Sequence, residues 1–276
     1  MSVAAQKRVA AIHDLSGFGR CSLTVIIPTL SAMGTQVCPV PTAILSTHTG
    51  GFSGMVFRDL TDYIGLCCNH YKKLEISFDA IYSGFLASTE QIEGCLRFFK
   101  EFPSALKIVD PVMGDNGKPY QTYTKELCAR MSELTGIADI ITPNLTEAAI
   151  LLGEDFPANG KLNHTTAYNW LERLCERTPT VIITGVCVDD KVCNIGLERF
   201  SREIHCVDYQ HIPVHYPGTG DIFASVLTGA ILNGHDLRTA ISRATRFARK
   251  SVELTYKTGG ESRNGVMFEK LLSELM

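Results

Sequence analysis

Short apolar runs alternate with helix-like segments along almost the whole of this chain. The runs end in small, polar or proline residues, as strands buried on both faces do. They are Arg8–His13, Thr35–Leu45, Asp79–Gly84, Leu106–Val112, Ala138–Asn144 and Thr180–Gly185. The segments between them that favour helices are Leu23–Gly34, Glu90–Lys100, Lys125–Leu134, Leu145–Leu152 and Thr165–Arg177. The alternation predicts an α/β fold with a central, mostly parallel β-sheet and helices on both faces.

The pattern changes after the last of these strands. Residues 191–214 favour antiparallel strands with a turn near Arg199–Arg202, and two long helical stretches follow, Ile222–Leu232 and Asp236–Tyr256. The prolines of the second run, Pro39 and Pro41, indicate an edge or an irregular path, because proline cannot donate to a sheet ladder. No repeat, low-complexity segment or linker divides the chain, so we expect a single domain over residues 1–276.

Composition narrows the classes of partner. The 276 residues carry a net charge of −3, and the charges are mixed along the chain. A basic block or acidic tail would suggest nucleic acid or membrane as the main partner, and neither is present in the sequence. No apolar run reaches membrane-spanning length, and the N-terminal segment lacks the apolar core of a secretory signal. We therefore expect a cytoplasmic protein whose ten cysteines are reduced, most of them acting as small buried hydrophobes.

Polar side chains follow several of the predicted strands. In open α/β sheets, ligands bind beyond the carboxyl ends of the strands. The groups predicted to meet there are Asp14 and Ser16, Asp110, Asn144 and Glu147, Thr184, and the turn Gly218–Asp221. The sequence thus predicts a polar site at one edge of the sheet.

The stretch "PGTGD" (217–221) stands directly before a predicted helix. Glycine permits backbone angles closed to other residues, and main-chain N–H groups at a helix N-terminus bind anions. Beside a bound phosphate, Asp221 can act as the general base that deprotonates an attacking hydroxyl. The alternative is that Asp221 only caps the helix, which is a common role for aspartate.

Two further motifs carry acids or amides at strand ends, "DPVMGD" (110–115) and "TPNLTE" (142–147). Asp110 and Glu147 are suited to Mg²⁺, which takes one or two carboxylates together with water and phosphate oxygens. The alternative for Asn144 and Glu147 is structural, since an Asn three residues before a Glu forms a capping box at a helix start. A phosphate-binding loop of the G-x-x-x-x-G-K-[ST] type is not found in the sequence.

Taken in order, "SGFGRCSLT" (16–24), "THTGG" (47–51), "DPVMGD", "TPNLTE" and "PGTGD" resemble the motifs of the ribokinase-like superfamily, and within it the pyridoxal (vitamin B6) kinases. The resemblance covers essentially the whole chain. It implies ATP-dependent phosphorylation of the 5′-hydroxymethyl group of pyridoxal, pyridoxine or pyridoxamine in vitamin salvage. It also implies Mg²⁺ and a homodimer, and it leaves a requirement for K⁺ or Na⁺ open.

The resemblance assigns roles to individual residues. Asp221 matches the catalytic base, and Gly218, Thr219 and Gly220 match the anion hole for the transferring phosphoryl group. Residues that match the ATP and metal sites are Asp110, Asn144, Glu147, Thr184, Gly185 and Thr219, with Asp110 and Glu147 nearest the metal. Thr49 matches a threonine that touches the vitamin ring, and Tyr123 resembles a lid tyrosine near the substrate.

The first motif departs from the pyridoxal kinase pattern. "HDLSGFGR" reads more like the hydroxymethylpyrimidine kinases, and an ungapped alignment puts the ring-binding serine near His13 or Asp14. We expect Asp14 and Ser16 to contact the substrate ring. The alternative for Ser16 is a turn role, and His13 and His48 are expected to be structural.

Two other functions stay open. A hydroxymethylpyrimidine kinase is the nearer, although that family commonly carries cysteine where this chain has Asp221. A non-catalytic vitamer-binding sensor is the other. The intact set Asp221, Asn144 and Glu147 argues against it, because a site without turnover would tolerate their loss.

Overall fold

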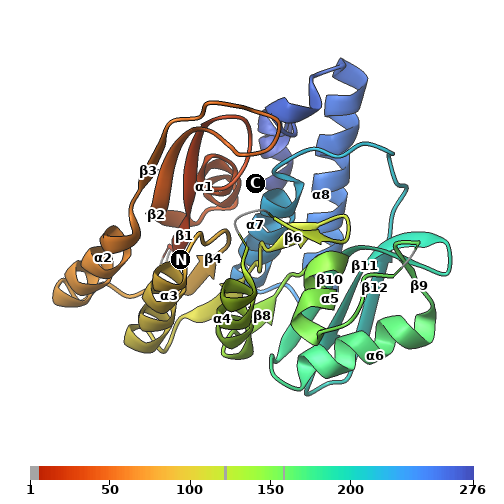
Figure 1. Cartoon of the computed structure of the whole chain (residues 1–276), viewed down its shortest axis with the longest axis horizontal. Helices are drawn as coiled ribbons and strands as arrows, with labels where there is room; N and C mark the ends of the chain where they lie inside the picture. The colour runs from red at the N-terminus through yellow and green to blue at the C-terminus, as the bar shows by residue number, and fades with distance from the viewer. Residues whose placement is uncertain (1–5, 121–122, 158) are drawn as a thin grey trace, which may run out of the picture.

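A single ten-stranded sheet forms the centre of the protein (Figure 1). The computed structural model describes residues 6–120, 123–157 and 159–276. The strands of the sheet are β1 (Arg8–Phe18), β2 (Gln36–Thr47), β3 (Phe57–Asp59), β4 (Ala80–Ser83), β5 (Leu106–Val109), β8 (Ile140–Ile141), β9 (Lys161–Leu162), β10 (Thr180–Val188), β11 (Lys191–Glu198) and β12 (Ile204–Asp208). Their order is β12-β11-β10-β8-β5-β4-β1-β2-β3, and β9 pairs with β10.

The centre of the sheet is parallel and both ends are antiparallel. β2, β1, β4, β5, β8 and β10 pair in parallel in that order. The predicted antiparallel segment is confirmed as β10–β11–β12. β3 adds a second antiparallel pair at the opposite end, and it pairs only with Ala43–Leu45 of β2. Pro39 and Pro41 of β2 therefore lie on a free edge, as their missing N–H groups require.

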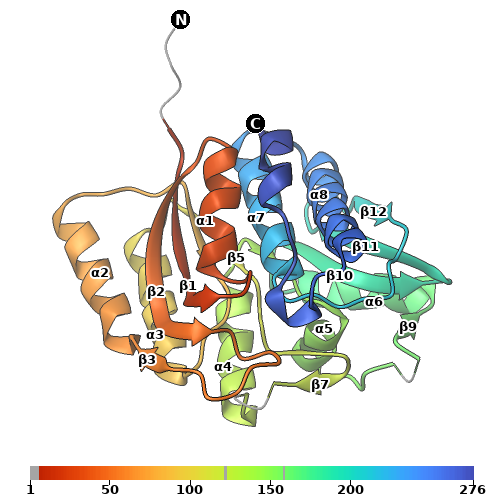
Figure 2. The same cartoon turned by 90° about the horizontal axis from the view of Figure 1, so that it is seen from above.

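Helices cover both faces of the sheet (Figure 2). One face carries α1 (Leu23–Ala32), α7 (Thr219–Leu232) and α8 (Leu237–Thr258), and the other carries α2 (Thr61–Lys73), α3 (Thr89–Glu101), α4 (Lys125–Gly136), α5 (Leu145–Leu152) and α6 (His164–Cys175). Strand β1 shows how two cores arise. Val9 and Ala11 belong to the core under α7, while Ala10 and Ile12 belong to the core on the other face. Successive side chains of a strand point to opposite faces, so a parallel central strand needs apolar residues at every position.

Some elements were not predicted. The helix α2 was missed because its apolar stripe is weak: it consists of Ile64, Cys67, Cys68 and Tyr71 at helical spacing, and only the first three are buried. A hairpin of β6 (Gly114–Asp115) and β7 (Lys118–Pro119) follows the "DPV" turn. Two 3₁₀ turns close the chain, at Ser262–Asn264 and Glu269–Leu275.

The cysteines and the lengths of the helices can be compared with what the composition predicted. All ten cysteines have free thiols, and Cys206 is the exposed one among them. No helix in the described ranges combines the length and apolar character that a membrane span requires.

Candidate functional site

The predicted polar groups meet at the carboxyl edge of the parallel strands. Asp14 lies in β1 just beyond the part that pairs with β4, and Asp110 follows β5 directly. Asp221 lies in the first turn of α7. Asn144 also lies at this edge, because it forms a parallel β-bridge with Thr184 of β10. The acids come together here because neighbouring parallel strands all end at the same edge.

The turn before α7 has the geometry of an anion site. Gly218 is the N-cap residue with φ +84°, and Gly220 is exposed. The N–H groups of a helix's first turn have no partner inside the helix, so they can receive an anion. The hydroxyl of Thr219 donates to the carbonyl of Tyr216 at 2.9 Å, which ties the turn to the preceding segment.

Asp221 does not cap its own helix. No side chain caps α7, and Oδ2 of Asp221 accepts a hydrogen bond of 2.8 Å from the main-chain N–H of Ser22. Burial raises the pKa of Asp221 to about 6; the Ser22 hydrogen bond opposes this shift and the charge of Asp14 adds to it. A carboxylate with this pKa is ionised at neutral pH and still basic enough to accept a proton.

Asp110 lies next to the same turn. A Cβ atom placed on Gly220 would lie 3.8 Å from Oδ2 of Asp110. Burial, followed by the negative charge of Asp221, raises the pKa of Asp110 to about 8. Two acids held this close cannot both ionise freely without a cation or a proton between them.

Asn144 and Glu147 form the capping box that the sequence offered as their structural alternative. Oδ1 of Asn144 accepts from the N–H of Glu147 at 3.0 Å, and Oε2 of Glu147 accepts from the N–H of Asn144 at 2.8 Å. The pair also holds the "DPVMGD" loop: Met113 N–H donates to Glu147 at 3.1 Å, and Asn144 Nδ2 donates to the carbonyl of Gly114 at 2.9 Å. Burial raises the pKa of Glu147 well above its usual value.

Asp14 and Ser16 form one hydrogen-bonded group. Ser16 Oγ donates to Oδ2 of Asp14 at 2.8 Å, and Ser22 Oγ donates to Oδ1 at 2.6 Å. Both side chains are buried, and burial raises the pKa of Asp14. Thr49 is exposed just beyond β2. Its neighbour His48 contacts Gly50 N–H through Nδ1 and the carbonyl of Arg263 through Nε2, which agrees with the structural role expected for this histidine.

His13 is buried as a structural histidine, while Tyr123 lies in the core and not at the site. His13 is buried, its ring nitrogens have no hydrogen-bond partner within the described ranges, and burial lowers its pKa to about 3. Tyr123 is only 7% exposed, and its hydroxyl donates to the carbonyl of Leu86 at 2.9 Å, so its ring belongs to the core. Tyr120 is 42% exposed and stands among the acids of the site.

Tyr120 is the residue that sequence reasoning missed. Partial burial and the surrounding negative charges raise the pKa of its phenol. The acids that act on it are Glu147, Asp115, Asp110 and Asp221. The hairpin β6–β7 ends directly before Tyr120 and places it there, and the N–H of Tyr120 donates to the carbonyl of Met113 at 2.8 Å. The sequence contained two tyrosines in one loop and no pattern that separated them.

Thr184 and Gly185 lie at an irregularity of β10, between its two segments that pair with β11. The register of β10 with β11 shifts between Ile183 and Val186, and Gly185 has φ +63°. Its N–H donates to Oδ1 of Asn194 at 2.8 Å. Such an irregularity in a strand re-aims side chains at a sheet edge, and it places Thr184 beside Asn144.

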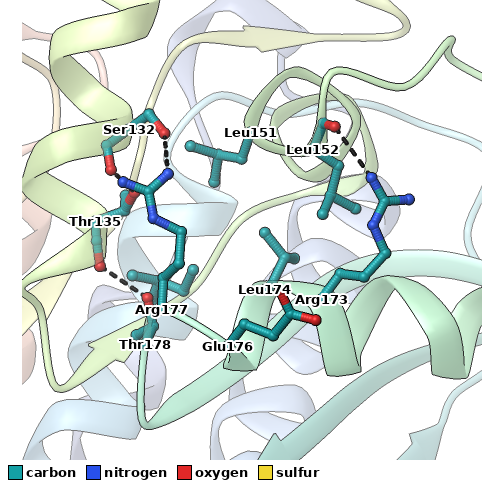
Figure 3. A pocket seen from close by; sticks show the side chains of 10 residues that line it. Ser132, Thr135, Leu151, Leu152, Arg173, Leu174, Glu176, Arg177 and Thr178 are labelled. Atoms are coloured by element: carbon teal, nitrogen blue, oxygen red, sulfur yellow. Dashed lines mark hydrogen bonds between the residues drawn. The ribbon is translucent and has the colours of Figure 1, made fainter.

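A cavity of about 180 Å³ lies elsewhere, among the C-terminal ends of α4, α5 and α6 (Figure 3). Arg177 Nη1 donates to Ser132 Oγ at 2.9 Å, and Thr178 Oγ1 donates to the carbonyl of Thr135 at 2.8 Å. Arg173 Nη2 donates to the carbonyl of Leu152 at 3.3 Å. The strands of the parallel sheet begin on this side, and the acid-rich edge lies at their other ends.

A mostly parallel sheet with an antiparallel end, and an acid in a glycine turn before a helix at its carboxyl edge, define the ribokinase-like class. The chain belongs to the phosphomethylpyrimidine kinase family, whose model matches residues 26–266. The resemblance to the pyridoxal kinases is confirmed by solved structures.

Three solved structures show the relationship. A Bacteroides thetaiotaomicron protein, provisionally named a phosphomethylpyrimidine kinase and crystallised with pyridoxal, is 43% identical, with a TM-score of 0.92 over 98% of this chain and 96% of its own. Pyridoxal kinase from Lactobacillus plantarum is 28% identical, with a TM-score of 0.90 over 99% of this chain and 97% of its own. The Leishmania donovani pyridoxal kinase, in complex with ADP and pyridoxamine, shares the fold at 21% identity and a TM-score of 0.78 over 98% of this chain and 96% of its own.

Proposed function

We propose that this kinase transfers the γ-phosphoryl group of Mg-ATP to the 5′-hydroxymethyl group of a B6 vitamer. The observation that carries the proposal is the placement of Asp221. Its carboxylate is partly buried in the first turn of α7, next to the exposed Gly220 and within the field of Asp110. In the proposal Asp221 is the base, the turn is the anion site, and Asp110 is the second acid beside them.

The transfer needs positioning and charge stabilisation more than covalent chemistry. In the proposal the main-chain N–H groups of Thr219 and Gly220 meet the charge that develops on the phosphoryl oxygens. One such donor typically contributes about 3–4 kcal/mol in the transition state. Asp221 orients the vitamer hydroxyl and accepts its proton, for which its raised pKa is suited.

The residues present fit a magnesium ion that binds together with nucleotide phosphates. Asp110 keeps a carboxyl group buried at the site although burial disfavours its charge, and a nearby cation would offset that cost. No group of three or more candidate ligands was found in the described part of the chain, so phosphate and water oxygens would complete the coordination. When bound, Mg²⁺ would draw charge from the leaving phosphate.

Glu147 acts in the proposal mainly by holding the loop that carries Asp110. Both of its carboxylate oxygens already accept main-chain N–H groups, and its remaining lone pairs can accept from metal-bound water. Thr184 and Gly185 would contact the nucleotide from β10. Whether K⁺ or Na⁺ also takes part is tested by turnover in buffers that contain only one of the two ions.

The vitamer ring would be held from the opposite side by Asp14, Ser16 and Thr49. Ser16 is fully buried and its hydroxyl donates to Asp14, so in the proposal it acts on the ring by orienting the Asp14 carboxylate. That carboxylate can accept from an N–H or O–H group of the ring, which the vitamers offer. The core position of Tyr123 leaves Tyr120 as the tyrosine that faces the bound substrates.

Hydroxymethylpyrimidine kinase activity is the second candidate, because the matching family is described as phosphomethylpyrimidine kinase, which names a related pyrimidine substrate. The deciding experiment measures ADP release with each vitamer, hydroxymethylpyrimidine, its phosphate and ribose. We expect the highest kcat/KM with a vitamer. A higher value with the pyrimidine would move the assignment to that substrate, and binding without turnover for every compound would support a vitamer-binding sensor instead.

We also infer that the chain forms a homodimer, as the resemblance implies. Exposed apolar side chains gather at the β3 end of the sheet, where Ile44 of β2, Val56 and Phe57 are 45%, 71% and 47% exposed. Light scattering of the protein in solution measures the mass directly, and a monomer mass at micromolar concentration would contradict the inference.

A further inference from the structure

Ser22 has an unusual backbone for a buried residue. Its φ is +52° and its ψ is −137°, in a region that side-chain-bearing residues rarely adopt. The other non-glycine residues with positive φ in the described ranges are exposed: Glu75, Asn116, Asp189, Asp190 and Arg202. Ser22 is 7% exposed, so no solvent-facing turn explains its conformation.

The side chain of Ser22 does not do what its position predicts. Ser22 is the N-cap residue of α1, where a serine normally accepts a hydrogen bond from its helix. Here the side chain makes no capping bond and donates instead to Oδ1 of Asp14 at 2.6 Å. The helix begins on the carbonyl of Ser22, which accepts from Val25 and Ile26 at 3.0 Å each.

The main chain of Ser22 holds the carboxylate of Asp221. The N–H of Ser22 donates to Oδ2 of Asp221 at 2.8 Å, across 199 residues of sequence. One residue thus holds an acid of the expected ring site through its hydroxyl and the expected base through its N–H. Its strained backbone is what aims both groups at once.

The segment before Ser22 is braced. A Cβ atom on Gly218 would lie 1.9 Å from the carbonyl oxygen of Arg20, and one on Gly265 would lie 2.7 Å from the N of Arg20. The guanidinium of Arg20 donates to Glu269 at 2.5 Å and to the carbonyl of Asn264 at 3.2 Å. Contacts on both sides keep the strained residue in place, as strained residues at functional sites require.

We propose that Ser22 is a positioning residue that sets the carboxylate of Asp221 relative to Asp14 and thereby links the ring site to the base. The inference rests on the proposed function. It adds a residue that acts through Asp221 and that lies in the motif "SGFGRCSLT" without a role assigned to it there.

The charges around Asp221 determine in which direction a change at Ser22 shifts the pKa of Asp221. The titratable groups that act on or around Asp221 from the neighbouring elements are Asp14, Cys21, Tyr82, Asp110 and Tyr120. None of them is cationic; of the nearby bases, His48 acts on Asp14 and Arg20 pairs with Glu269. The N–H of Ser22 is therefore the donor that favours the ionised Asp221 carboxylate. Loosening Ser22 therefore raises the pKa of Asp221.

Two substitutions separate the hydroxyl from the backbone constraint. Ser22→Ala removes the bond to Asp14 and keeps the strain, while Ser22→Gly removes both, because glycine adopts positive φ freely. Ser22→Gly should have a Tm at or above that of Ser22→Ala, and a kcat about tenfold lower than wild type with an unchanged KM for ATP. In both variants the acid limb of the kcat profile should move to higher pH, further in Ser22→Gly.

Glu75→Gly is the matched control, since it relieves a positive φ of 55° at an exposed residue beyond α2 and should leave kcat unchanged. The pKa of Asp221 is also measured by carbon NMR in wild type and both Ser22 variants. A wild-type kcat and an unshifted Asp221 pKa in both variants would overturn the proposal. If the wild-type protein turns over no substrate, the proposed function fails, and the NMR titration still decides the role of Ser22.

Discussion

The α-carbon of Gly218 packs against the carbonyl oxygen of Arg20, so closely that a Cβ atom would lie 1.9 Å from that oxygen. A Cβ atom on Gly220, two residues further along, would meet only Oδ2 of Asp110, at 3.8 Å. Glycine is therefore needed at the two positions of this motif for different physical reasons. Gly218 is required by the fold, whereas Gly220 is exposed and free to approach a ligand.

The glycine pair gives the first prediction. Gly218→Ala should lower the free energy of unfolding by at least about 2 kcal/mol, because of its positive φ and the clash with Arg20. Gly220→Ala should keep the wild-type Tm and lose about 10²-fold in kcat, because its methyl group displaces the phosphoryl group. Thermal melts and ADP release measure the two effects. If Gly220→Ala keeps full turnover, the turn does not hold the phosphoryl group.

Replacing the proposed base tests its role. Asp221→Asn should lower kcat on the order of 10²–10⁴-fold while ATP still binds, because general-base catalysis contributes about that much. Calorimetry with ATP and ADP release provide the measurements. Asp236→Asn is the matched control: Asp236 is an exposed N-cap of α8, and asparagine caps equally well. Near-normal turnover in Asp221→Asn would remove Asp221 from the base role.

The pKa of Asp221, raised to about 6, predicts where the reaction rate falls on the acid side of its pH profile. The base works in its ionised form, so kcat/KM for the vitamer should be half-maximal near pH 6, level off above about pH 7 and fall about tenfold for each pH unit well below 6. Steady-state assays at subsaturating vitamer from pH 5 to 8 measure this decrease. A flat profile down to pH 5 would show that a different group accepts the proton.

Asp110 should destabilise the protein when no cation is bound. Below pH 3.8 both the folded and the unfolded chain hold its proton. Between 3.8 and about 8 only the folded chain keeps it, so stability falls as pH rises, by up to about 1.4 kcal/mol per unit. Asp110→Asn should remove this slope and raise the stability at pH 8 while it lowers turnover. Urea unfolding at pH 5 and pH 8 measures the difference.

Replacing Glu147 should have the opposite effect on stability from replacing Asp110. Glu147→Gln would turn an amide NH₂ toward one of the main-chain N–H groups of Met113 or Asn144. An unmade buried hydrogen bond costs about 1–3 kcal/mol, so this variant should be less stable at both pH values. Equal stabilities for Asp110→Asn and Glu147→Gln would contradict the separation of a site acid from a loop clamp.

The two tyrosines form a matched pair. Tyr120→Phe should reduce kcat/KM and leave the Tm unchanged, because its phenol faces the acids of the site. Tyr123→Phe should lower the free energy of unfolding by about 1 kcal/mol through the lost bond to Leu86, with unchanged kinetics. The reverse pattern would return the substrate-facing role to Tyr123.

Local patterns account for the parts that were predicted correctly. Burial on both faces requires continuous apolar runs in β4, β5 and β10, so these strands were predicted from the runs, and the helices between them predicted a parallel sheet. The spatial order of the strands was not predicted. The helix α2 was missed because its apolar stripe is made of one isoleucine, two cysteines and a tyrosine. The capping box of Asn144 and Glu147 was predicted because its two partners lie within one turn of helix.

The sequence by itself determined the parallel sheet, the motif order and the acid in a glycine turn, since each depends on residues near one another in the chain. Only the tertiary structure decided that Ser22 holds Asp221, that Gly218 packs on Arg20, and that Tyr120 faces the acids while Tyr123 does not. The physical reason is distance along the chain: the bond of Ser22 to Asp221 spans 199 residues. Periodicity reports whether a residue is buried, but packing selects the partner it is buried against.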